Sequence, residues 1–356
     1  MNDRYLRHRT LSGFGDEAQQ KLEAASVLVV GAGGLGVPVL QYLNAMGVGR
    51  IGIVDADTVS VTNLHRQPLY TEADVGKEKA MVVANFLKQQ NSENQKEVYT
   101  RYLTSENALE LISQYDVVVD ASDNFATRYL VNDACVILGK PFVYGGLFGF
   151  EGQVSVFNFE DGPTYRCLYP EMSDGVVADC NTHGVLGVVP GIIGNLQALE
   201  AVKVITGIGG VLSGTLLLID TLSMQVFKMR VSAKEENKTI DALKTRYETP
   251  GCRNSQTISP EVLAEAAEDY VVLDVRTETE FTAWHIKGSL NIPLEELKDR
   301  LDEVAGNKPV CLVCKQAVRT RSAAVILEGH SSEVYELEGG LDNYQSKVGT
   351  DETDFK

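Results

Sequence analysis

The glycine-rich segment that begins at Gly31 constrains the fold of this chain more than any other feature. A short apolar run at residues 26–30 leads into Gly31, Gly33 and Gly36, which form the pattern G-x-G-x-x-G before a helical stretch. A second β-rich run follows at residues 50–54. Glycines at these positions allow a tight turn between a strand and a helix. The segment therefore predicts a β-α-β unit, which belongs to a parallel sheet.

The alternation of strands and helices continues along the first two thirds of the chain. Helices are expected at residues 77–90, 132–138 and 190–206, strands at 115–120 and 141–144, alternating antiparallel strands at 153–159, and a closing hairpin at 215–219 and 224–229. Strands that alternate with helices favour a parallel sheet covered on both faces. We therefore predict an α/β fold with a Rossmann-like, doubly wound, mostly parallel sheet and an antiparallel extension.

A change of composition divides the chain. The predicted divisions are a first domain at residues 1–231, a charged and polar linker at 232–256, a second domain at 257–346 and a tail at 347–356. Ser259-Pro260-Glu261 is a helix-start signature. Strands at 271–275 and 310–313 and a helix at 318–328 make the second domain a smaller α/β unit.

Charge and composition exclude several classes of protein. The net charge of −17 argues against a nonspecific binder of nucleic acid or of an anionic membrane. The most apolar stretch, residues 184–220, is interrupted by Asn195, Glu200 and Lys203, so it is expected to be core and not a membrane span. The chain starts without an apolar signal region, and its six cysteines are irregularly spaced. We therefore expect a protein of the reducing cytoplasm.

The glycine loop indicates a phosphate ligand. Backbone N–H groups at Gly31, Gly33 and Gly36 can approach a phosphate at a helix N-terminus. Asp55 closes the second strand 19 residues after Gly36, which is the usual place for a carboxylate that binds a ribose hydroxyl. These features alone would also fit an NAD- or FAD-binding oxidoreductase.

The polar residues beyond Asp57 favour a triphosphate over a dinucleotide. Asn63, Arg66 and Lys79 follow in succession. A dinucleotide needs no such series, whereas attack on the α-phosphorus of a triphosphate develops charge that these side chains would stabilise. Asp123 lies just past the strand at 115–120, where α/β sheets bind ligands, and it is a candidate Mg²⁺ ligand.

These motifs resemble the ubiquitin-activating-type adenylyltransferases of the MoeB and ThiF group. The matching segments span nearly all of residues 4–230 and are RYLRH, VLVVGAGGLGVPVLQYLNAMGVGRIGIVDADTVSVTNLHRQ, DVGKEKA, DASDN, EGQVSVF, YRCLYP and GVLGVVPGIIGNLQALEAVKVITG. The resemblance implies an ATP site lined by Gly34, Asp55, Asn63, Arg66, Lys79 and Asp123. It also implies a two-fold homodimer in which Arg7 reaches into the site of the partner subunit.

The family activates the C-terminal Gly-Gly carboxylate of a small ubiquitin-like sulfur carrier. This reaction needs no general base, because a free carboxylate is already ionised near neutral pH. The protein has only to align the carboxylate with the α-phosphate and to neutralise the leaving pyrophosphate, for which Arg66, Lys79 and Mg²⁺ on Asp123 suffice. The resemblance thus implies ATP and Mg²⁺ as cofactors.

The same resemblance bears on the roles of two cysteines of the first domain. Relatives that transfer sulfur have a cysteine at the position of Cys180, which implies a thiol that attacks the activated or persulfidated carboxylate. The alternative is a small buried apolar residue, but the Asp-Cys-Asn-Thr-His context is too polar for a core. Many relatives also hold zinc with two C-x-x-C pairs. Cys167 is retained here, but Thr164 replaces its partner, and residues 231–236, where the second pair should follow Arg230, contain no cysteine, so no structural zinc is expected.

The second domain resembles rhodanese, a sulfurtransferase domain, over residues 257–346. The motifs are DVR at 274–276, EF at 280–281, HIKG at 285–288, NIPL at 291–294 and GGL at 339–341. The resemblance implies an active loop CKQAVR with Cys314 as the nucleophile. Backbone N–H groups at a helix N-terminus would stabilise a persulfide anion there, and Lys315 and Arg319 add positive charge. Ala317 departs from the family, which usually has glycine at this position.

No metal is predicted at Cys311 or at the histidines His183 and His285. Cys311 forms a C-x-x-C pair with Cys314, but it falls inside the strand and is expected to be core. His285 belongs to the rhodanese pattern and His183 flanks Cys180, and neither is assigned a metal.

The predicted function is an ATP-dependent adenylyltransferase fused to its sulfur donor. The carrier carboxylate becomes an acyl-adenylate, a persulfide on Cys314 attacks it, and Cys180 resolves the acyl disulfide to a thiocarboxylate. An upstream persulfide donor such as a cysteine desulfurase would load Cys314. The expected carrier is of the molybdopterin-synthase small-subunit type, with thiazole-biosynthesis and tRNA-thiolation carriers as alternatives. An NAD-binding oxidoreductase would leave Asn63, Arg66 and Lys79 unexplained, and a non-catalytic scaffold would have lost the ATP ligands.

Overall fold

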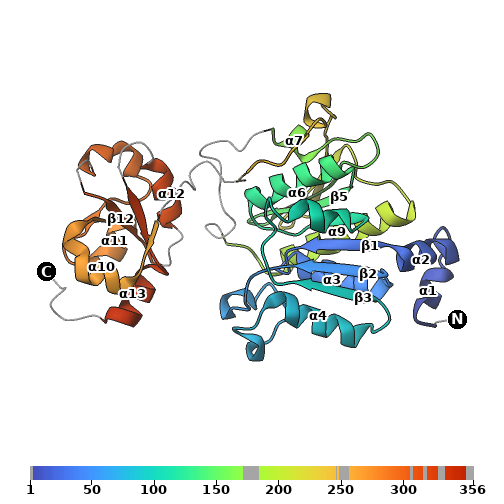
Figure 1. The fold of residues 1–356 in the computed structure, drawn as a ribbon, viewed down its shortest axis with the longest axis horizontal. Helices are drawn as coiled ribbons and strands as arrows, with labels where there is room; N and C mark the ends of the chain where they lie inside the picture. Colours follow the sequence, from blue (N-terminus) through green and yellow to red (C-terminus); the bar gives the residue numbers. More distant parts are fainter. Residues whose placement is uncertain are drawn as a thin grey trace. The chain divides into compact units, whose positions relative to one another are not determined.

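The computed structural model describes residues 3–170, 184–245, 247, 256–304, 308–315, 319–327 and 333–349. The described residues form two compact units (Figure 1). Unit 1 holds the described residues up to Tyr247, and unit 2 holds those from residue 256 onward. Each unit is built on a sheet of its own.

Unit 1 contains an eight-stranded sheet in the order β3-β2-β1-β4-β5-β6-β7-β8. Its strands are β1 (Ser26–Val30), β2 (Arg50–Val54), β3 (Gln95–Tyr99), β4 (Val117–Asp120), β5 (Phe142–Phe148), β6 (Glu151–Phe157), β7 (Thr215–Asp220) and β8 (Gln225–Arg230). The first five strands in this order are parallel, and β6, β7 and β8 are antiparallel. The predicted mostly parallel sheet with an antiparallel extension is confirmed.

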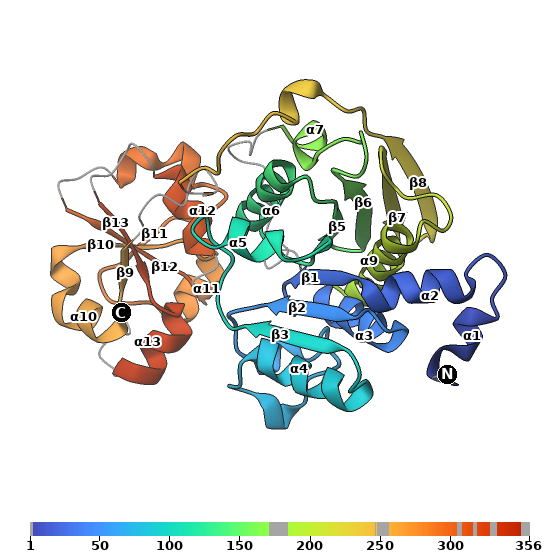
Figure 2. The same ribbon diagram turned by 45° about the vertical axis from the view of Figure 1, so that its right-hand side comes forward.

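Helices cover both faces of this sheet. They are α1 (Leu6–Arg9), α2 (Gly15–Ala24), α3 (Gly36–Met46), α4 (Lys79–Gln90), α5 (Ala108–Ser113), α6 (Phe125–Leu138), α7 (Tyr165–Leu168) and α9 (Val188–Thr206). Along β1, Val27 and Val29 pack toward α3, α4 and α9, whereas Leu28 and Val30 pack toward α5 and α6 (Figure 2). The sheet is therefore doubly wound, because the crossovers after β1 and β2 lie on one face and those after β3 and β4 on the other.

Several elements of unit 1 lie outside the sequence prediction. The strand β3 reads QKEVY and has no fully buried residue, so it lacks the apolar run by which a buried strand is recognised. The helix α6 begins at Phe125, well before the predicted residue 132, because the Asn124 side chain accepts a hydrogen bond from the Thr127 N–H at 2.8 Å and caps it. The short helices α2 and α5 were not predicted.

The first part of the predicted linker packs onto unit 1. The Tyr247 hydroxyl donates to Asp133 Oδ2 at 2.8 Å, and Asp133 also receives the guanidinium of Arg166 at 2.7 and 2.8 Å. Asn237 donates to the Arg166 carbonyl, and the Lys244 carbonyl accepts from Ser105. The chain after β8 is therefore tied to α6 and α7 up to Tyr247.

The helix α9 is the longest apolar helix of unit 1. Among the described residues it alone is long and apolar enough to cross a membrane, and half of it is buried inside the structure. It packs on α3 and on the strands β5 and β6. Ile193, Ala198 and Val202 enter the core, so this helix is part of the unit's interior, as the interruption of the 184–220 stretch predicts.

Unit 2 is a smaller, fully parallel sheet in the order β11-β10-β12-β13-β9. Its elements are β9 (Gln256–Ile258), β10 (Val271–Asp274), β11 (Leu290–Asn291), β12 (Val310–Val313), β13 (Val334–Leu337), α10 (Pro260–Ala266), α11 (Glu278–Ala283), α12 (Arg319–Ile326) and α13 (Gly340–Val348). Ser259 caps α10 by accepting from the Val262 N–H, as its sequence signature predicts. Two small apolar cores lie on the two faces of the sheet.

The ion pair that anchors Tyr247 predicts a stability difference. Asp133→Asn should lower the unfolding free energy of unit 1 by about 3 kcal/mol, because it leaves the nearly buried Arg166 guanidinium without a charged partner. Tyr247→Phe removes one hydrogen bond and should cost about 1 kcal/mol. Urea denaturation followed by far-UV circular dichroism measures both changes. The only tryptophan, Trp284, lies in unit 2, so its fluorescence transition should stay unchanged; a shift there instead would contradict the assignment of this network to unit 1.

Candidate functional site

The glycine loop is pressed against the end of β4. Gly31 has a φ of +100°, and a Cβ there would lie 2.7 Å from the carbonyl oxygen of Ala121. A Cβ at Gly36 would overlap the carbonyl oxygen of Gly31. Both positions therefore require glycine, and the helix α3 can start directly from the carboxyl end of β1. This geometry brings the loop N–H groups to the edge where β1, β2 and β4 all end.

Asp55 braces this loop from the end of β2. Its Oδ2 accepts the Ala32 N–H at 2.7 Å, and its Oδ1 accepts the Asp57 N–H at 2.8 Å. Burial raises the pKa of Asp55, while the two backbone hydrogen bonds and the charge of Lys79 oppose that rise. The carboxylate thus holds the loop in place, and it stands at the position predicted for a ribose partner.

Lys79 is held at the same edge by Asp57. Its Nζ lies 2.9 Å from Asp57 Oδ2, and the lysine side chain is only 6% exposed whereas that of Asp57 is 53% exposed. The Lys79 backbone N–H also donates to the Asp57 carbonyl, so the first residue of α4 is fixed to the loop after β2. A nearly buried ammonium therefore lies at the carboxyl end of β2, where its charge also acts on Asp55.

Tyr102 belongs to this edge, and the sequence prediction missed it. Its hydroxyl donates to Asp57 Oδ1 at 3.3 Å. The negative charge of Asp57 is the main reason for its raised pKa, and Asp55 and Asp123 add to the effect. Tyr102 is 68% exposed and follows β3, the polar strand that the hydrophobic pattern did not reveal. Its ring is available to a planar ligand beside these carboxylates.

The segment with Asn63 and Arg66 packs on the glycine loop. Arg66 donates from Nη1 to the Thr62 carbonyl at 3.0 Å, within a short helical turn that starts before Asn63. A Cβ at Gly34 would lie 3.3 Å from the Arg66 carbonyl oxygen, which places the two backbones in close contact. The backbone of Arg66 therefore lies against the loop, and Asn63, whose carbonyl accepts the Arg66 N–H, belongs to the same turn.

Asp123 is an exposed carboxylate just beyond β4. Its charge acts on Tyr102, so it faces the same edge as Asp55 and Asp57. Mg²⁺ in phosphate-transfer sites is commonly bound through one or two carboxylates and the substrate phosphates, which an exposed Asp123 fits. Among the residues that the structure describes, no group of three or more His, Cys, Asp or Glu side chains could hold a metal without such help.

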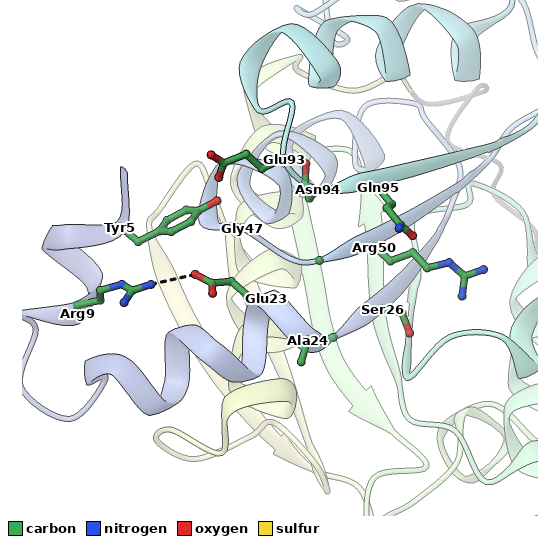
Figure 3. Close-up of a pocket in the computed structure, with 12 residues that line it drawn as sticks. Tyr5, Arg9, Glu23, Ala24, Ser26, Gly47, Arg50, Glu93, Asn94 and Gln95 are labelled. Carbon is green, nitrogen blue, oxygen red and sulfur yellow. Dashed lines mark hydrogen bonds and ion pairs between the residues drawn. The ribbon is translucent and has the colours of Figure 1, made fainter. Parts of the chain in front are cut away.

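Arg7 lies on α1, away from this edge. The neighbouring residues Tyr5 and Arg9 line a pocket of about 740 Å³ with Ser26, Arg50 and other residues at the amino ends of β1, β2 and β3 (Figure 3). That pocket is therefore at the opposite end of the sheet from the glycine loop. Arg7 is exposed and does not reach the loop of its own chain, so the predicted role in a partner subunit's site stays a prediction.

Cys167 occupies the position where a zinc ligand was considered. Its Sγ lies 3.4 Å from Thr164 Oγ1 and accepts the Lys234 N–H at 3.3 Å. Burial alone would raise the pKa of this thiol, but hydrogen bonds from Thr164, Lys234 and Asn237 together lower it. Hydrogen-bond donors thus surround the sulfur on the sides where relatives would supply further cysteines. The expected absence of zinc stays a prediction.

Cys314 stands at the carboxyl end of β12 in unit 2 and is 1% exposed. Its carbonyl accepts the Leu341 N–H at 2.9 Å, and that of Lys315 accepts the Asp342 N–H at 3.0 Å, so the start of the loop is fastened to α13. Arg319 is the first residue of α12. Ala317 lies outside the described residues, as do Cys180 and His183, so these predictions remain as they stand.

Cys311 and His285, which lie in the same unit, have contacts that are typical of structural residues. Cys311 is fully buried, and burial raises the pKa of its thiol to about 12, which confirms it as a core residue. His285 stacks on Phe281, with ring centroids 3.9 Å apart, and its Nδ1 lies 2.9 Å from the Phe281 carbonyl oxygen. The contacts of the His285 imidazole are therefore with Phe281, four residues earlier in the chain.

Comparison with known proteins identifies both units. Residues 5–240 match the ThiF family, and residues 259–347 match the rhodanese-like domain. A sulfur carrier protein adenylyltransferase of Thermus thermophilus is 55% identical over 235 residues, which cover 64% of this chain and 87% of that protein. The adenylyltransferase and sulfurtransferase MOCS3 of Anopheles gambiae is 41% identical over 345 residues, with 88% of this chain and 78% of that protein covered.

Further similarities extend the match. A probable molybdopterin-synthase adenylyltransferase of Porphyra purpurea is 36% identical over 98% of this chain and 94% of its own length. Among solved structures, Escherichia coli MccB with ATP is similar, with a TM-score of 0.59, 25% identity, and coverage of 66% of this chain and 73% of that one. Because the first family model spans well over half of the chain, the chain belongs to the ThiF family, and it carries a rhodanese-like domain after it.

Proposed function

We propose that unit 1 uses ATP to adenylylate the C-terminal carboxylate of a small ubiquitin-like sulfur carrier, and that Cys314 of unit 2 supplies the sulfur. The observation that carries this proposal is the edge of unit 1 where the glycine loop, Lys79 and Asp123 come together. The relatives are named adenylyltransferases and sulfurtransferases, and the chain has both corresponding domains. An NAD-dependent reaction would use neither the cationic side chains nor unit 2.

Adenylation requires positioning and charge stabilisation rather than proton transfer. The ionised carboxylate of the carrier attacks the α-phosphorus, an acyl-phosphate bond forms, and the bond to the pyrophosphate leaving group breaks. The loop N–H groups and Asn63 would hold the phosphates, and Asp55 would hold the ribose. Lys79 and Arg66 would neutralise the charge that accumulates on pyrophosphate. Mg²⁺ on Asp123 would supply further positive charge when bound.

Sulfur transfer then follows in unit 2. The persulfide on Cys314 attacks the acyl carbon, AMP leaves, and an acyl disulfide joins the carrier to Cys314. The Cys180 thiolate attacks the Cys314 sulfur of that disulfide, which releases the carrier thiocarboxylate and leaves a Cys180–Cys314 disulfide. A thiol reductant must then reduce this bond before another turnover.

The partners follow from this chemistry. The carrier must end in a flexible Gly-Gly segment that can enter the edge of unit 1, and the molybdopterin-synthase type is favoured by the name of the relative from Porphyra purpurea. A thiazole-biosynthesis carrier is not favoured by any of the relatives reported above. Cys314 needs an upstream persulfide donor such as a cysteine desulfurase.

We also propose a homodimer in the cytoplasm. Tyr42 on α3 and Leu199 on α9 are about half exposed, and these two helices pack on each other. Apolar side chains on adjoining helices are typical of an interface between subunits. The described cysteines Cys135, Cys167, Cys311 and Cys314 are free thiols, which fits a reducing compartment.

Asp123→Ala should abolish ATP–pyrophosphate exchange that depends on carrier and Mg²⁺, because the metal loses its protein ligand. Asp241→Ala removes an exposed carboxylate from the segment after β8 and should keep the wild-type rate. The rate of label exchange between pyrophosphate and ATP measures both. Wild-type exchange in the Asp123 variant would refute its assignment to the metal.

Lys79→Ala should lower the exchange rate by about 10²- to 10³-fold, because one preorganised donor to the developing phosphate charge is lost. Lys77 provides a matched control: it lies two residues earlier, is exposed and pairs with Asp74. Lys77→Ala should therefore change the rate less than about twofold. Equal effects of the two substitutions would show that Lys79 acts through general charge and not from its place beside the loop.

Cys314→Ala should keep ATP–pyrophosphate exchange and lose thiocarboxylate formation, because adenylation uses only phosphate chemistry. Cys180→Ala should keep exchange and slow thiocarboxylate release, and the defect should shrink as free thiol is added because external thiols can resolve the acyl disulfide. Mass spectrometry of the carrier, with a titration of reductant, follows the product. Cys167→Ala is the control for loss of a partly exposed thiol. If the Cys314 variant forms thiocarboxylate at the wild-type rate from a persulfide donor, unit 2 is not the donor.

A further inference from the structure

Tyr102 in unit 1 presents an exposed aromatic ring on a backbone that is held in place. At 68% exposure it is the most exposed aromatic residue in the part of the chain that the structure describes. The next residue, Leu103, is buried in the core beside α5 and α6. The Asn107 amide donates to the Tyr102 carbonyl at 2.9 Å, and its oxygen accepts the Thr104 N–H at 3.0 Å. The ring is therefore a preformed apolar surface that a ligand can cover without ordering the loop first.

The hydroxyl of Tyr102 and the charges around it place the ring at the glycine-loop edge. The hydroxyl donates to Asp57 Oδ1 at 3.3 Å, and the other oxygen of that carboxylate binds Lys79 at 2.9 Å. The charge of Asp57 is the main reason that the pKa of Tyr102 is raised, and Asp55 and Asp123 add to the rise. These carboxylates come from the loops after β2 and β4. A residue that follows β3 therefore lies beside the ends of both other strands.

The strand order gives the direction in which a nucleotide would extend along this edge. The parallel strands β1, β2 and β3 are neighbours, about 5 Å apart (Figure 2). The Asp55 N–H donates to the Tyr99 carbonyl at 3.2 Å, which joins the ends of β2 and β3. The glycine loop follows β1, Asp55 follows β2, and Tyr102 is the third residue after β3. A nucleotide with its phosphates at the loop and its ribose at Asp55 thus directs its base toward Tyr102.

The chemistry around the ring suits a base better than any charged part of a ligand. The carboxylates of Asp55, Asp57 and Asp123 act on Tyr102, so a phosphate or a free carboxylate against the ring would meet like charges. A nucleobase is neutral and planar, and stacking on an aromatic side chain uses only its face. Because the Tyr102 hydroxyl is bound at the rim of the ring, it can keep its contact with Asp57 while the face is covered.

We propose that Tyr102 stacks on the base of the bound nucleotide and so supplies a substantial part of the affinity of unit 1 for ATP. The inference rests on the proposed use of ATP by unit 1. It adds a contact to the base, whereas the contacts proposed above reach only the phosphates and the ribose. Tyr102 would touch the nucleotide away from the reacting phosphorus, so it acts on binding and not on the chemical step.

A base contact of this kind has a distinct kinetic signature. The base stays in place while the α-phosphorus is attacked, so stacking stabilises the bound substrate and the transition state equally. Loss of such uniform binding raises KM and leaves kcat unchanged. ATP–pyrophosphate exchange contains an internal control, because pyrophosphate has no base. The KM for pyrophosphate should therefore not depend on Tyr102.

The test uses Tyr102→Ala in the full chain. Calorimetric titration with ATP and Mg²⁺, without carrier, should show a Kd about tenfold higher than that of the wild type, as expected for the loss of one stacked base. In the exchange assay the KM for ATP should rise by a similar factor, whereas kcat and the KM for pyrophosphate should stay within about twofold. An unchanged Kd for ATP, or equal rises in the KM values for ATP and pyrophosphate, overturns the proposal.

Two matched variants separate stacking from other effects of the substitution. Tyr102→Phe keeps the ring and loses only the hydrogen bond to Asp57, so its Kd for ATP should stay within about threefold of the wild-type value. A Phe variant that binds ATP as weakly as the Ala variant would assign the effect to the hydroxyl and refute stacking. Phe86→Ala removes an exposed ring from α4, about two helical turns beyond Lys79, and should leave the Kd unchanged. Far-UV circular dichroism confirms that each variant is folded.

The exchange assay also tests whether the ring serves the carrier protein instead. If Tyr102→Ala raises the KM for the carrier and leaves the Kd for ATP unchanged, the ring belongs to the carrier interface and the present inference is wrong. The failure of the proposed function looks different. A wild-type chain that binds ATP but shows no carrier-dependent exchange refutes carrier adenylylation, whereas the calorimetric comparison of Tyr102→Ala and Tyr102→Phe still decides the role of Tyr102.

Discussion

The close packing of the glycine loop on the end of β4 is the contact on which unit 1 depends. Gly31 approaches the Ala121 carbonyl more closely than any side chain would permit, and Gly36 does the same to Gly31. Asp55 then fastens the loop by accepting the Ala32 N–H. With this contact in place, β1, β2 and β4 end together, and the helix α3 starts beside them. Because these strand ends lie together, the cationic and acidic groups of three separate loops can meet at one edge of the sheet.

An aspartate forms the same turn at the end of a strand in both candidate sites. Asp120 and Asp274 are the last residues of parallel strands, and Asp55 directly follows one. Each accepts with Oδ1 the N–H of the residue two positions later, at 2.8 to 3.0 Å. Such a turn redirects the chain sharply at the carboxyl end of the strand. Loops that leave the sheet in this way stay close to its edge, which is where parallel sheets bind ligands. In unit 1 the edge holds the glycine loop, and in unit 2 it holds Cys314.

Charged side chains at the sheet edges of both units form ion pairs. Lys79 is bound to Asp57 in unit 1, and Arg319 is bound to Glu280 in unit 2. An unpaired cation in a nearly buried position would be costly, and a carboxylate partner removes that cost. The two pairs differ in how their carboxylates are held. Asp57 is about half exposed, whereas Glu280 also accepts hydrogen bonds from the N–H and hydroxyl of Thr277.

The sequence by itself determined the features that depend on local patterns. Short apolar runs, the glycine spacing and the helix-start signature at Ser259 indicate the doubly wound sheet, its antiparallel extension and the second α/β unit, because backbone conformation and burial periodicity act over a few residues. The same logic placed Asp55 and Cys314 at strand ends. The strand β3 escaped detection because its residues are polar, and Tyr102 escaped with it. Only the tertiary structure decided that Tyr247 is tied to Asp133, that Lys79 is paired with Asp57, and that Arg319 is held by Glu280. These contacts join residues that lie 22 to 114 positions apart, and which charge meets which is settled by how the elements pack and not by the order of residues along the chain.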